Sequence, residues 1–114
     1  MTKARQAFGA WGEGRAARWY QEQGYEVLDR NWRCADGELD LVLGKGRTVV
    51  FTEVKTRRSD AFGIGAEAVT PAKQRRIRRL AVQWLKASGT RGVDLRFDVV
   101  SILGPDLTVI EAAF

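Results

Sequence analysis

Histidine is absent from this sequence of 114 residues, and cysteine occurs once, at Cys34. These two facts exclude His-based catalysis, a zinc site built from cysteine and histidine, and a disulfide within the chain. The N-terminal residues lead into no apolar run of signal-peptide or membrane-span length, so we expect a cytoplasmic protein without a membrane partner. The length predicts a single domain, residues 1–114, that folds without covalent cross-links.

Acidic residues are also fewer than basic ones, fourteen against nineteen, which gives a net charge of +5. An excess of this size favours a polyanionic partner. The stretch from Lys73 to Arg91 contains seven basic residues and no acidic one. They are Lys73, Arg75, Arg76, Arg78, Arg79, Lys86 and Arg91. Charge alone leaves two interpretations open, a solvated helix face and a phosphate-binding one.

Apolar periodicity and turn residues predict the order α-β-β-β-α-β-β. Thr70 and Pro71 are typical of a helix start, and Gly24 and Gly89 of helix ends. A Gly-rich loop is expected at residues 57–69. The expected helices cover residues 4–23 and 71–87, and the expected strands cover 25–33, 38–43, 48–55, 95–103 and 107–111.

The two strands that flank Gly44-Lys45-Gly46-Arg47 carry two acids and a lysine. If Lys45-Gly46 is the two-residue loop of a hairpin, Asp40 lies opposite Phe51, and Asp40, Glu53 and Lys55 share one face. The other face would be nearly all apolar, comprising Leu39, Leu41, Leu43, Val50, Thr52 and Val54. Carboxylates on a half-buried face are costly unless they are paired or bind a metal, and oxygen ligands suit Mg²⁺ or Mn²⁺. A solvated face with an ordinary Glu53 to Lys55 ion pair remains open.

The first helix has two distinct sides. A small-residue side is expected to comprise Gly9, Ala10, Glu13, Ala16, Ala17 and Tyr20. Glu13 on that side should find a strong partner, join a metal cluster or reach water at the edge. Gly12 and Gly14 each weaken the helix by roughly 1 kcal/mol relative to alanine, a cost that indicates a close approach to the backbone.

The opposite side of this helix carries Phe8, Trp11 and Trp19 together with Arg15 and Arg18. Such a surface fits a partner subunit, most simply in a homodimer, or nucleic acid, on whose bases aromatic and arginine side chains stack. Burial under the N-terminal residues is the third alternative. In the second helix, Ile77, Leu80, Ala81, Trp84 and Leu85 form the predicted core stripe.

Three features together resemble the PD-(D/E)XK nuclease superfamily. They are the acid Glu13 on the first helix, the acid Asp40, and the segment Glu53-Val54-Lys55, which begins thirteen positions after Asp40. Over about residues 8–103, the chain is also similar to the YraN-like family of small predicted endonucleases, which is related to archaeal Holliday junction resolvases. The similar segments are Gly12-Glu13, Gly24-Tyr25, Asn31-Trp32-Arg33, Gly37-Glu38-Leu39-Asp40-Leu41-Val42, Glu53-Val54-Lys55-Thr56-Arg57, Phe62-Gly63, Lys73-Gln74 and Arg96-Phe97-Asp98-Val99-Val100. Leu39 stands where the superfamily usually has proline.

The resemblance implies a restriction-endonuclease-like α/β fold, with an α-β-β-β-α-β core and a mixed central sheet flanked by helices. It implies that Asp40, Glu53 and the main-chain carbonyl of Val54 hold Mg²⁺ or Mn²⁺, and that Glu13 completes the acidic cluster. Lys55 would orient or activate the attacking water. Glu38 fits the family motif without an evident role, and we interpret Asp98 as structural. The residues expected to bind nucleic acid are Arg57, Lys73, Gln74, Arg75, Arg76, Arg79 and Lys86.

These observations favour a metal-dependent DNA endonuclease that acts on branched or distorted DNA in recombination or repair. The alternative is a nucleic-acid-binding module that keeps the nuclease scaffold without cutting. A third interpretation, a subunit that serves mainly protein assembly, draws only on the Phe8, Trp11 and Trp19 face.

Overall fold

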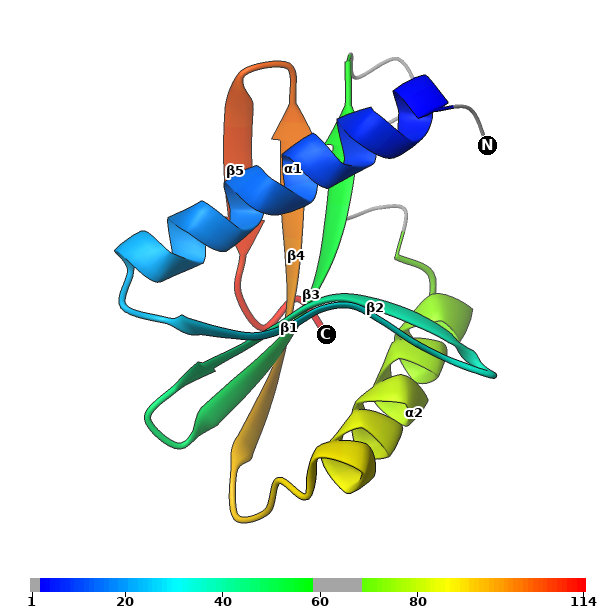
Figure 1. The fold of residues 1–114 in the computed structure, drawn as a ribbon, viewed down its shortest axis with the longest axis vertical. Coiled ribbons are helices and arrows are strands. Elements are labelled where there is room, and N and C mark those ends of the chain that lie inside the picture. The colour runs from blue at the N-terminus through cyan, green and yellow to red at the C-terminus, as the bar shows by residue number, and fades with distance from the viewer. Residues whose placement is uncertain (1–2, 59–68) are drawn as a thin grey trace.

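A twisted five-stranded sheet lies between two helices (Figure 1). The computed structural model describes residues 3–58 and 69–114. The elements in chain order are α1 (Lys3–Glu22), β1 (Glu26–Cys34), β2 (Gly37–Lys45), β3 (Thr48–Arg57), α2 (Pro71–Ser88), β4 (Asp94–Leu103) and β5 (Asp106–Ile110). This order is the predicted one, and a mixed sheet flanked by helices confirms the restriction-endonuclease-like fold class.

The strands lie in the sheet in the same order as in the sequence. β3 and β4 pair in parallel, whereas the other three neighbouring pairs are antiparallel. A parallel pair needs a crossover connection, and α2 lies in that connection. Figure 1 shows that β1 and β2 cross the direction of β4 and β5, as a strongly twisted sheet requires.

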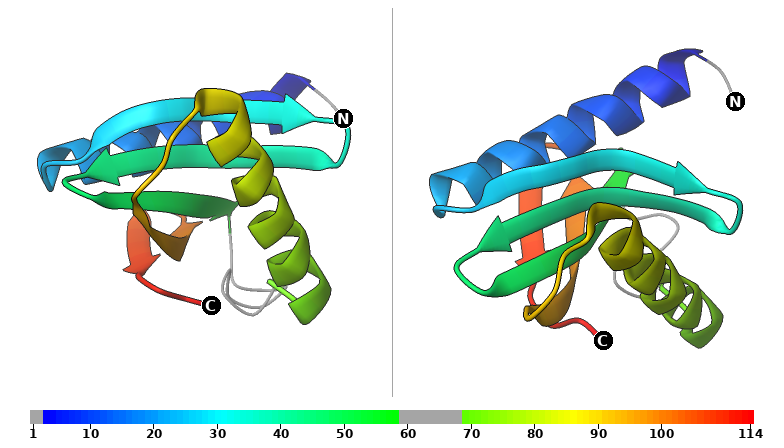
Figure 2. Two further views of the ribbon diagram at one scale, coloured as in Figure 1. Left: turned by 90° about the horizontal axis from the view of Figure 1, so that it is seen from below. Right: turned by 60° about the horizontal axis from the view of Figure 1, so that its bottom comes forward.

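Each helix covers its own face of the sheet, and Figure 2 shows the two helices on opposite sides. The core under α1 consists of Ala16, Ala17, Tyr20, Leu41, Leu43, Val50, Val100 and Ile102. The core under α2 consists of Leu39, Val42, Val49, Phe51, Val69, Ile77, Leu80, Ala81, Trp84, Phe97 and Val99. The predicted α2 stripe is thereby confirmed, with Leu85 partly buried against the same core. Neither described helix contains a stretch long and apolar enough to cross a membrane.

The ends of α2 follow the predicted chemistry. The Thr70 side chain accepts a hydrogen bond of 3.2 Å from the Lys73 backbone N–H, and Pro71 opens the helix. Gly89 ends it in the left-handed conformation, with φ of 72°. Of the Gly-rich loop expected at residues 57–69, residues 59–68 lie outside the described residues, and so does the Phe62-Gly63 motif.

The small-residue side of α1 is only partly as expected. Ala16, Ala17 and Tyr20 are fully buried, but Ala10 is exposed, which corrects its predicted place on the core side. Figure 1 shows that the N-terminal part of α1 projects beyond the sheet. Gly12 lies where the helix comes closest to β3, and a Cβ atom at Gly12 would lie 2.0 Å from Thr56 Oγ1.

The β2–β3 hairpin has a different register from the one predicted. Its two-residue loop is Gly46-Arg47 rather than Lys45-Gly46, so Gly44 pairs with Val49, and Phe51 pairs with Val42 instead of Asp40. The difference is two residues, and side chains alternate with a period of two. The predicted division of the two faces therefore largely survives the error in the turn.

Leu39 is the exception to that division. It was predicted on the same face as Leu41 and Leu43, but it packs under α2 whereas Leu41 and Leu43 pack under α1. The alternation is thus interrupted at Asp40. The neighbouring strand is irregular at the same level, because Asn31 has a φ of +49°, which is uncommon for residues other than glycine.

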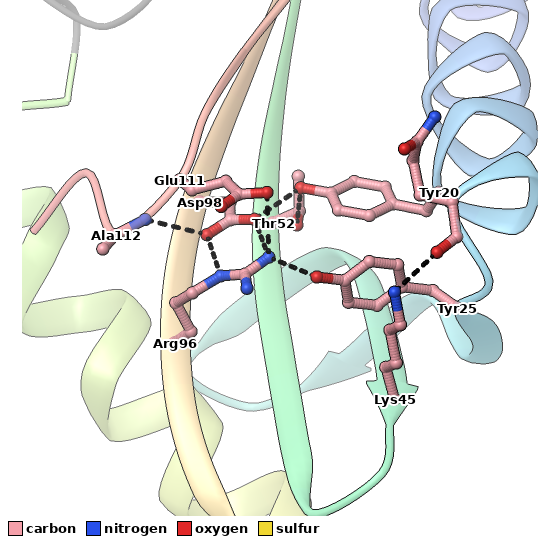
Figure 3. A network of polar contacts seen from close by, with 9 residues as sticks. Tyr20, Tyr25, Lys45, Thr52, Arg96, Asp98, Glu111 and Ala112 are labelled. Atoms are coloured by element: carbon pink, nitrogen blue, oxygen red, sulfur yellow. Dashed lines mark hydrogen bonds and ion pairs between the residues drawn. The ribbon is translucent and has the colours of Figure 1, made fainter.

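A buried polar network joins α1 to the sheet (Figure 3). The fully buried Asp98 carboxylate accepts hydrogen bonds from Tyr20 Oη at 2.8 Å and from two Arg96 nitrogens at 2.9 Å each. It also accepts the Ala112 backbone N–H at 3.0 Å, and the Thr52 hydroxyl donates to Tyr20 Oη. Burial raises the pKa of Tyr20, so this phenol stays protonated and can donate. These contacts support the structural interpretation of Asp98.

The contact between Gly12 and Thr56 predicts opposite effects for two alanine substitutions in α1. We expect Gly12→Ala to destabilise the protein by about 1–3 kcal/mol, because the added methyl group forces the helix away from Thr56. The matched control is Gly14→Ala, because no described atom outside the neighbouring residues and the helix backbone lies within 4 Å of the Cβ position at Gly14. It should stabilise the helix by about 0.5–1 kcal/mol. Denaturant unfolding measures both values, and equal effects would contradict the close packing.

Candidate metal and phosphate site

Three carboxylates meet where α1 passes the ends of β2 and β3. Glu13, Glu38 and Asp40 each place one oxygen within 4.8 Å of the other two. Glu13 comes from α1, and the other two come from the start of β2. All three side chains are partly buried. Such a group of hard oxygen donors is the ligand type that Mg²⁺ and Mn²⁺ prefer.

Asp40 occupies the point where β2 and β3 stop pairing. The ladder between these strands ends at Leu41 and Thr52, and beyond it the Asp40 carboxylate accepts the Val54 backbone N–H at 2.9 Å. The side chain thus takes the place of a main-chain acceptor and fixes the carboxylate against β3. Burial, followed by the charge of Glu53, raises the pKa of Asp40 to about 8. Burial and the charges of Glu38 and Glu53 also raise the pKa of Glu13.

Asn31 on β1 contacts the same cluster. With its amide nitrogen directed at the acids, Asn31 donates to Glu13 Oε2 at 2.8 Å and to Glu38 Oε1 at 2.9 Å. Glu38 also forms an ion pair of 3.1 Å with Arg33. The left-handed conformation of Asn31 aims this side chain at the carboxylates, so β1 contributes to the site although none of its residues was predicted there.

Glu53 and Lys55 are the other two predicted site residues, and they lie on β3 beside the acids. They form an ion pair of 3.1 Å, with 21% and 20% of their side chains exposed. Glu53 raises the pKa of Asp40 by its charge but does not belong to the trio of close carboxylates. The predicted Asp40 and Glu53 pair is therefore brought together, with Glu53 held by Lys55.

Lys73 reaches this site from the start of α2. The charge of Lys55, together with burial, lowers the pKa of Lys73, because the two ammonium groups lie side by side. Glu53 acts on Lys73 in the opposite direction. Two neighbouring cations of this kind are a receptor for an anion such as a phosphate.

A cleft of about 410 Å³ opens onto the site and is lined by residues of α1, β2 and β3. They are Phe8, Gly9, Glu13, Asp40, Val54, Lys55, Thr56 and Arg57. Its volume lies within the range typical of small-ligand sites. The cleft thus contains four of the predicted site residues and the predicted main-chain ligand Val54.

The remaining predicted nucleic-acid-binding residues lie farther along α2. The side chains of Arg75, Arg76, Arg79 and Lys86 are exposed, whereas Gln74 donates through its amide to the Val69 carbonyl at 3.1 Å. Gln74 thus holds the chain at the helix start.

Sequence reasoning did not assign a role to Glu38 or Asn31. Glu38 lies two positions before Asp40, so strand alternation already puts the two acids on one face, but it does not show that Glu13 of α1 joins them. Asn31 depends on a positive φ, which a strand pattern does not predict. Its place in the Asn31-Trp32-Arg33 motif was the available signal.

The chain matches the sequence model of the family described as "Uncharacterised protein family UPF0102" over residues 12–102. It is 54% identical over 101 residues to a UPF0102 protein of Beutenbergia cavernae, covering 89% of this chain and 86% of that one. It is 56% identical over 97 residues to one of Rhodococcus jostii, covering 85% and 82%. A relative from Geobacter sulfurreducens is 47% identical over 105 residues, covering 90% and 82%.

Because the pKa of Asp40 is raised, we expect the stability of the metal-free protein, measured in the presence of a chelator, to depend on pH. Between about pH 4 and pH 8 the folded protein binds more protons at this carboxyl than the unfolded chain, so the free energy of unfolding should fall as the pH rises. We expect Asp40→Asn, whose amide oxygen can still accept the Val54 N–H, to lose most of this slope. Millimolar Mg²⁺ should also flatten it, because a bound cation favours the ionised form.

Urea unfolding at several pH values measures this dependence. The control is Asp94→Asn, which removes an exposed acid paired with Arg47 at 3.3 Å. An identical slope in the wild type and in Asp40→Asn would contradict the assignment of the raised pKa to this cluster.

Proposed function

We propose that this chain, which belongs to the uncharacterised protein family UPF0102, is a metal-dependent endonuclease that hydrolyses phosphodiester bonds in branched or distorted DNA. One observation carries the proposal: the close carboxylates of Glu13, Glu38 and Asp40 lie beside a cleft that Lys55 also lines, and Lys73 neighbours Lys55. Repulsion within each group contributes to the shifted pKa values of Asp40 and Lys73. A divalent cation relieves the first repulsion and a phosphate relieves the second. A phosphodiester with its metal ion supplies both.

The donor set fits Mg²⁺ or Mn²⁺. Oxygens about 2.1 Å from a Mg²⁺ ion are at most about 4.2 Å apart, and the oxygens of Glu13, Glu38 and Asp40 already lie within 4.8 Å of one another. Val54 lines the cleft and the charge of Glu53 acts on Asp40. Glu53 and the Val54 carbonyl are the further ligands that the PD-(D/E)XK resemblance implies. A metal ion at this position would neutralise charge on the phosphate and lower the pKa of an attacking water.

The lysines carry the remaining tasks in the proposed reaction. Lys55 lines the cleft, where its ammonium group can orient the attacking water and stabilise the charge that develops on the phosphate. Lys73 lies beside Lys55 and binds a second oxygen of the same phosphate. Glu53 holds Lys55 in position through their ion pair. The leaving 3′ or 5′ oxygen takes a proton from solvent at the open side of the cleft.

DNA is the proposed substrate because the positive charge continues beyond the cleft. The exposed arginines of α2 follow Lys73 along the helix, and the whole chain carries a net charge of +5. Contacts between such arginines and successive phosphates contribute affinity that does not depend on the base sequence. A partner recognised by its backbone and shape fits this surface better than a small acidic metabolite does.

Cleavage assays test this function directly. Labelled four-way junction, flap, single strand and duplex are incubated with Mg²⁺, Mn²⁺ or EDTA, and we expect cleavage with metal and none in EDTA. Asp40→Asn and Lys55→Met should each reduce the cleavage rate on the order of 100-fold or more, since each removes a group that stabilises charge. Asp94→Asn, at the opposite end of β3 and β4, is the control that retains activity.

Binding of the uncut substrates separates the alternatives. A wild type that binds DNA but cuts none of the four substrates in either metal would favour the non-catalytic module. A wild type that neither binds nor cuts would contradict both.

Asn31 predicts a further effect on metal binding. We expect Asn31→Gly, which tolerates a positive φ, to weaken Mn²⁺ binding about 10-fold or more, as is typical when a group that positions metal ligands is lost. Asn31→Ala should weaken Mn²⁺ binding equally and in addition lower the free energy of unfolding by about 1 kcal/mol, because alanine disfavours this backbone. Calorimetric titration measures the affinities, and unchanged affinity in both variants would remove Asn31 from the site.

A further inference from the structure

Two aromatic rings stack on the part of α1 that projects beyond the sheet. The ring centroids of Phe8 and Trp11 are 5.7 Å apart, and the ring planes differ by 10°. The residues are three positions apart, so they lie on one side of the helix. Trp11 is 45% exposed, which is unusual for a side chain of this size.

A guanidinium group covers each of the two rings. Arg58 Cζ lies 4.7 Å from the centroid of Phe8, and Arg15 Cζ lies 5.3 Å from the centroid of Trp11. We call the two stacked rings, with the two arginines over them, the Phe8/Trp11 stack. It combines aromatic rings with two positive charges, and this combination matches a nucleotide, with its flat base and its phosphate.

The Phe8/Trp11 stack adjoins the candidate site. Phe8 lines the same cleft as Glu13, Asp40 and Lys55. Gly9, the next residue, has no side chain, and no described atom outside the neighbouring residues and the helix backbone lies within 4 Å of the Cβ position there. Gly9 therefore places no side chain in the cleft that Phe8 and the acids line, and one nucleotide can contact both.

We propose that the Phe8/Trp11 stack binds an unpaired nucleobase of the nucleic acid whose phosphate lies at the carboxylate and lysine site. The base stacks on Phe8 in the place of Arg58, and the guanidinium released pairs with a phosphate of the same strand. This inference rests on the proposed function for its choice of partner. It adds the substrate feature that is recognised, an unstacked base next to the cleavage position.

Base pairing determines which nucleic acids can use such a surface. In a duplex, neighbouring base pairs cover both faces of each base, so a protein ring stacks on a base only after it leaves the helix. A flap, a junction branch or a single strand already offers unstacked bases at little cost. The Phe8/Trp11 stack therefore favours these structures over an intact duplex, whereas the exposed arginines of α2 bind both.

A second copy of this chain fits the surface less well. Trp19, the third ring expected in a dimer interface, packs edge-on against Tyr20 with centroids 5.0 Å apart, and lines another groove with Arg15, Pro105 and Leu107. In a symmetric dimer the stack would face its own copy. Arg15 and Arg58 would then meet the same two positive charges, whereas a nucleic acid brings negative ones.

Binding measurements in EDTA test the inference without cleavage. Fluorescence anisotropy compares labelled oligo(dT) with a blunt hairpin duplex at one salt concentration, for wild type, Phe8→Leu and Trp11→Leu. Leucine keeps apolar bulk and helix propensity but removes the ring. We expect each variant to lose about 5-fold or more in affinity for oligo(dT), the lower end of the range for one stacked base, and less than 2-fold for the duplex.

Two controls make this comparison specific. Trp11→Phe keeps a ring and should retain oligo(dT) binding, whereas a merely structural role of tryptophan would not be rescued by this smaller side chain. Leu95→Ala removes exposed apolar surface at the far end of β4 and should change neither affinity. Thermal unfolding confirms that each variant is folded.

Several outcomes would overturn the inference. These are an equal loss for oligo(dT) and duplex, no loss for either, or sedimentation that shows a dimer in the wild type and a monomer in Trp11→Leu. Failure of the proposed function has a different signature: a wild type that cuts nothing but still loses oligo(dT) selectively on Trp11→Leu keeps the base site. A wild type that cuts, with no such selective loss, rejects the base site alone.

Discussion

The buried carboxylate of Asp98 determines how α1 lies on the sheet. It sits on β4 and receives four hydrogen bonds from Tyr20, Arg96 and the backbone of Ala112. Three distant parts of the chain thus meet at one charge: α1, the centre of the sheet and the segment after β5. Removing one partner from a fully buried charge of this kind typically costs about 3–5 kcal/mol. The position of Glu13, two turns before Tyr20 on the same helix, follows from this anchor.

The Asp40 carboxylate has surroundings that differ from those of Asp98. Arg96 forms a bidentate ion pair with Asp98 and so neutralises its charge. Asp40, in contrast, is affected most strongly by burial and by the charges of other acids, both of which raise its pKa. Close carboxylates are costly unless they are paired or bind a cation, and in this cluster Arg33 offsets the charge of Glu38. The contrast argues that the first cluster is structural and that the second is arranged for a ligand. The lysines beside it are compatible with the ligand that we propose, a phosphodiester with its metal ion.

The sequence predicted the element order and much of the site because both depend on periodicity. Alternation in β2 and β3 placed Asp40 near Glu53 even though the turn was assigned one residue too early, since the resulting two-residue error in register preserves the faces. Alternation could not predict the break at Asp40, which moved Leu39 to the other core. It also could not predict that Asn31 leaves the extended conformation to contact the acids. Both features arise where α1, β1 and β2 meet, and a local sequence pattern does not predict contacts between separate elements.

The N-terminal half of α1 explains why the proposed chemistry and the proposed base site occur together. The sheet covers α1 from Gly12 onwards, and Gly12 lets the helix approach Thr56 closely enough for Glu13 to reach Asp40. Phe8, one turn before Gly12, is partly buried and lines the cleft, whereas Trp11 is 45% exposed. The carboxylates of Glu13, Glu38 and Asp40 are likewise only partly buried. A nucleotide bound as proposed would therefore place its base on the Phe8/Trp11 stack and its phosphate at the acids and lysines of the same cleft.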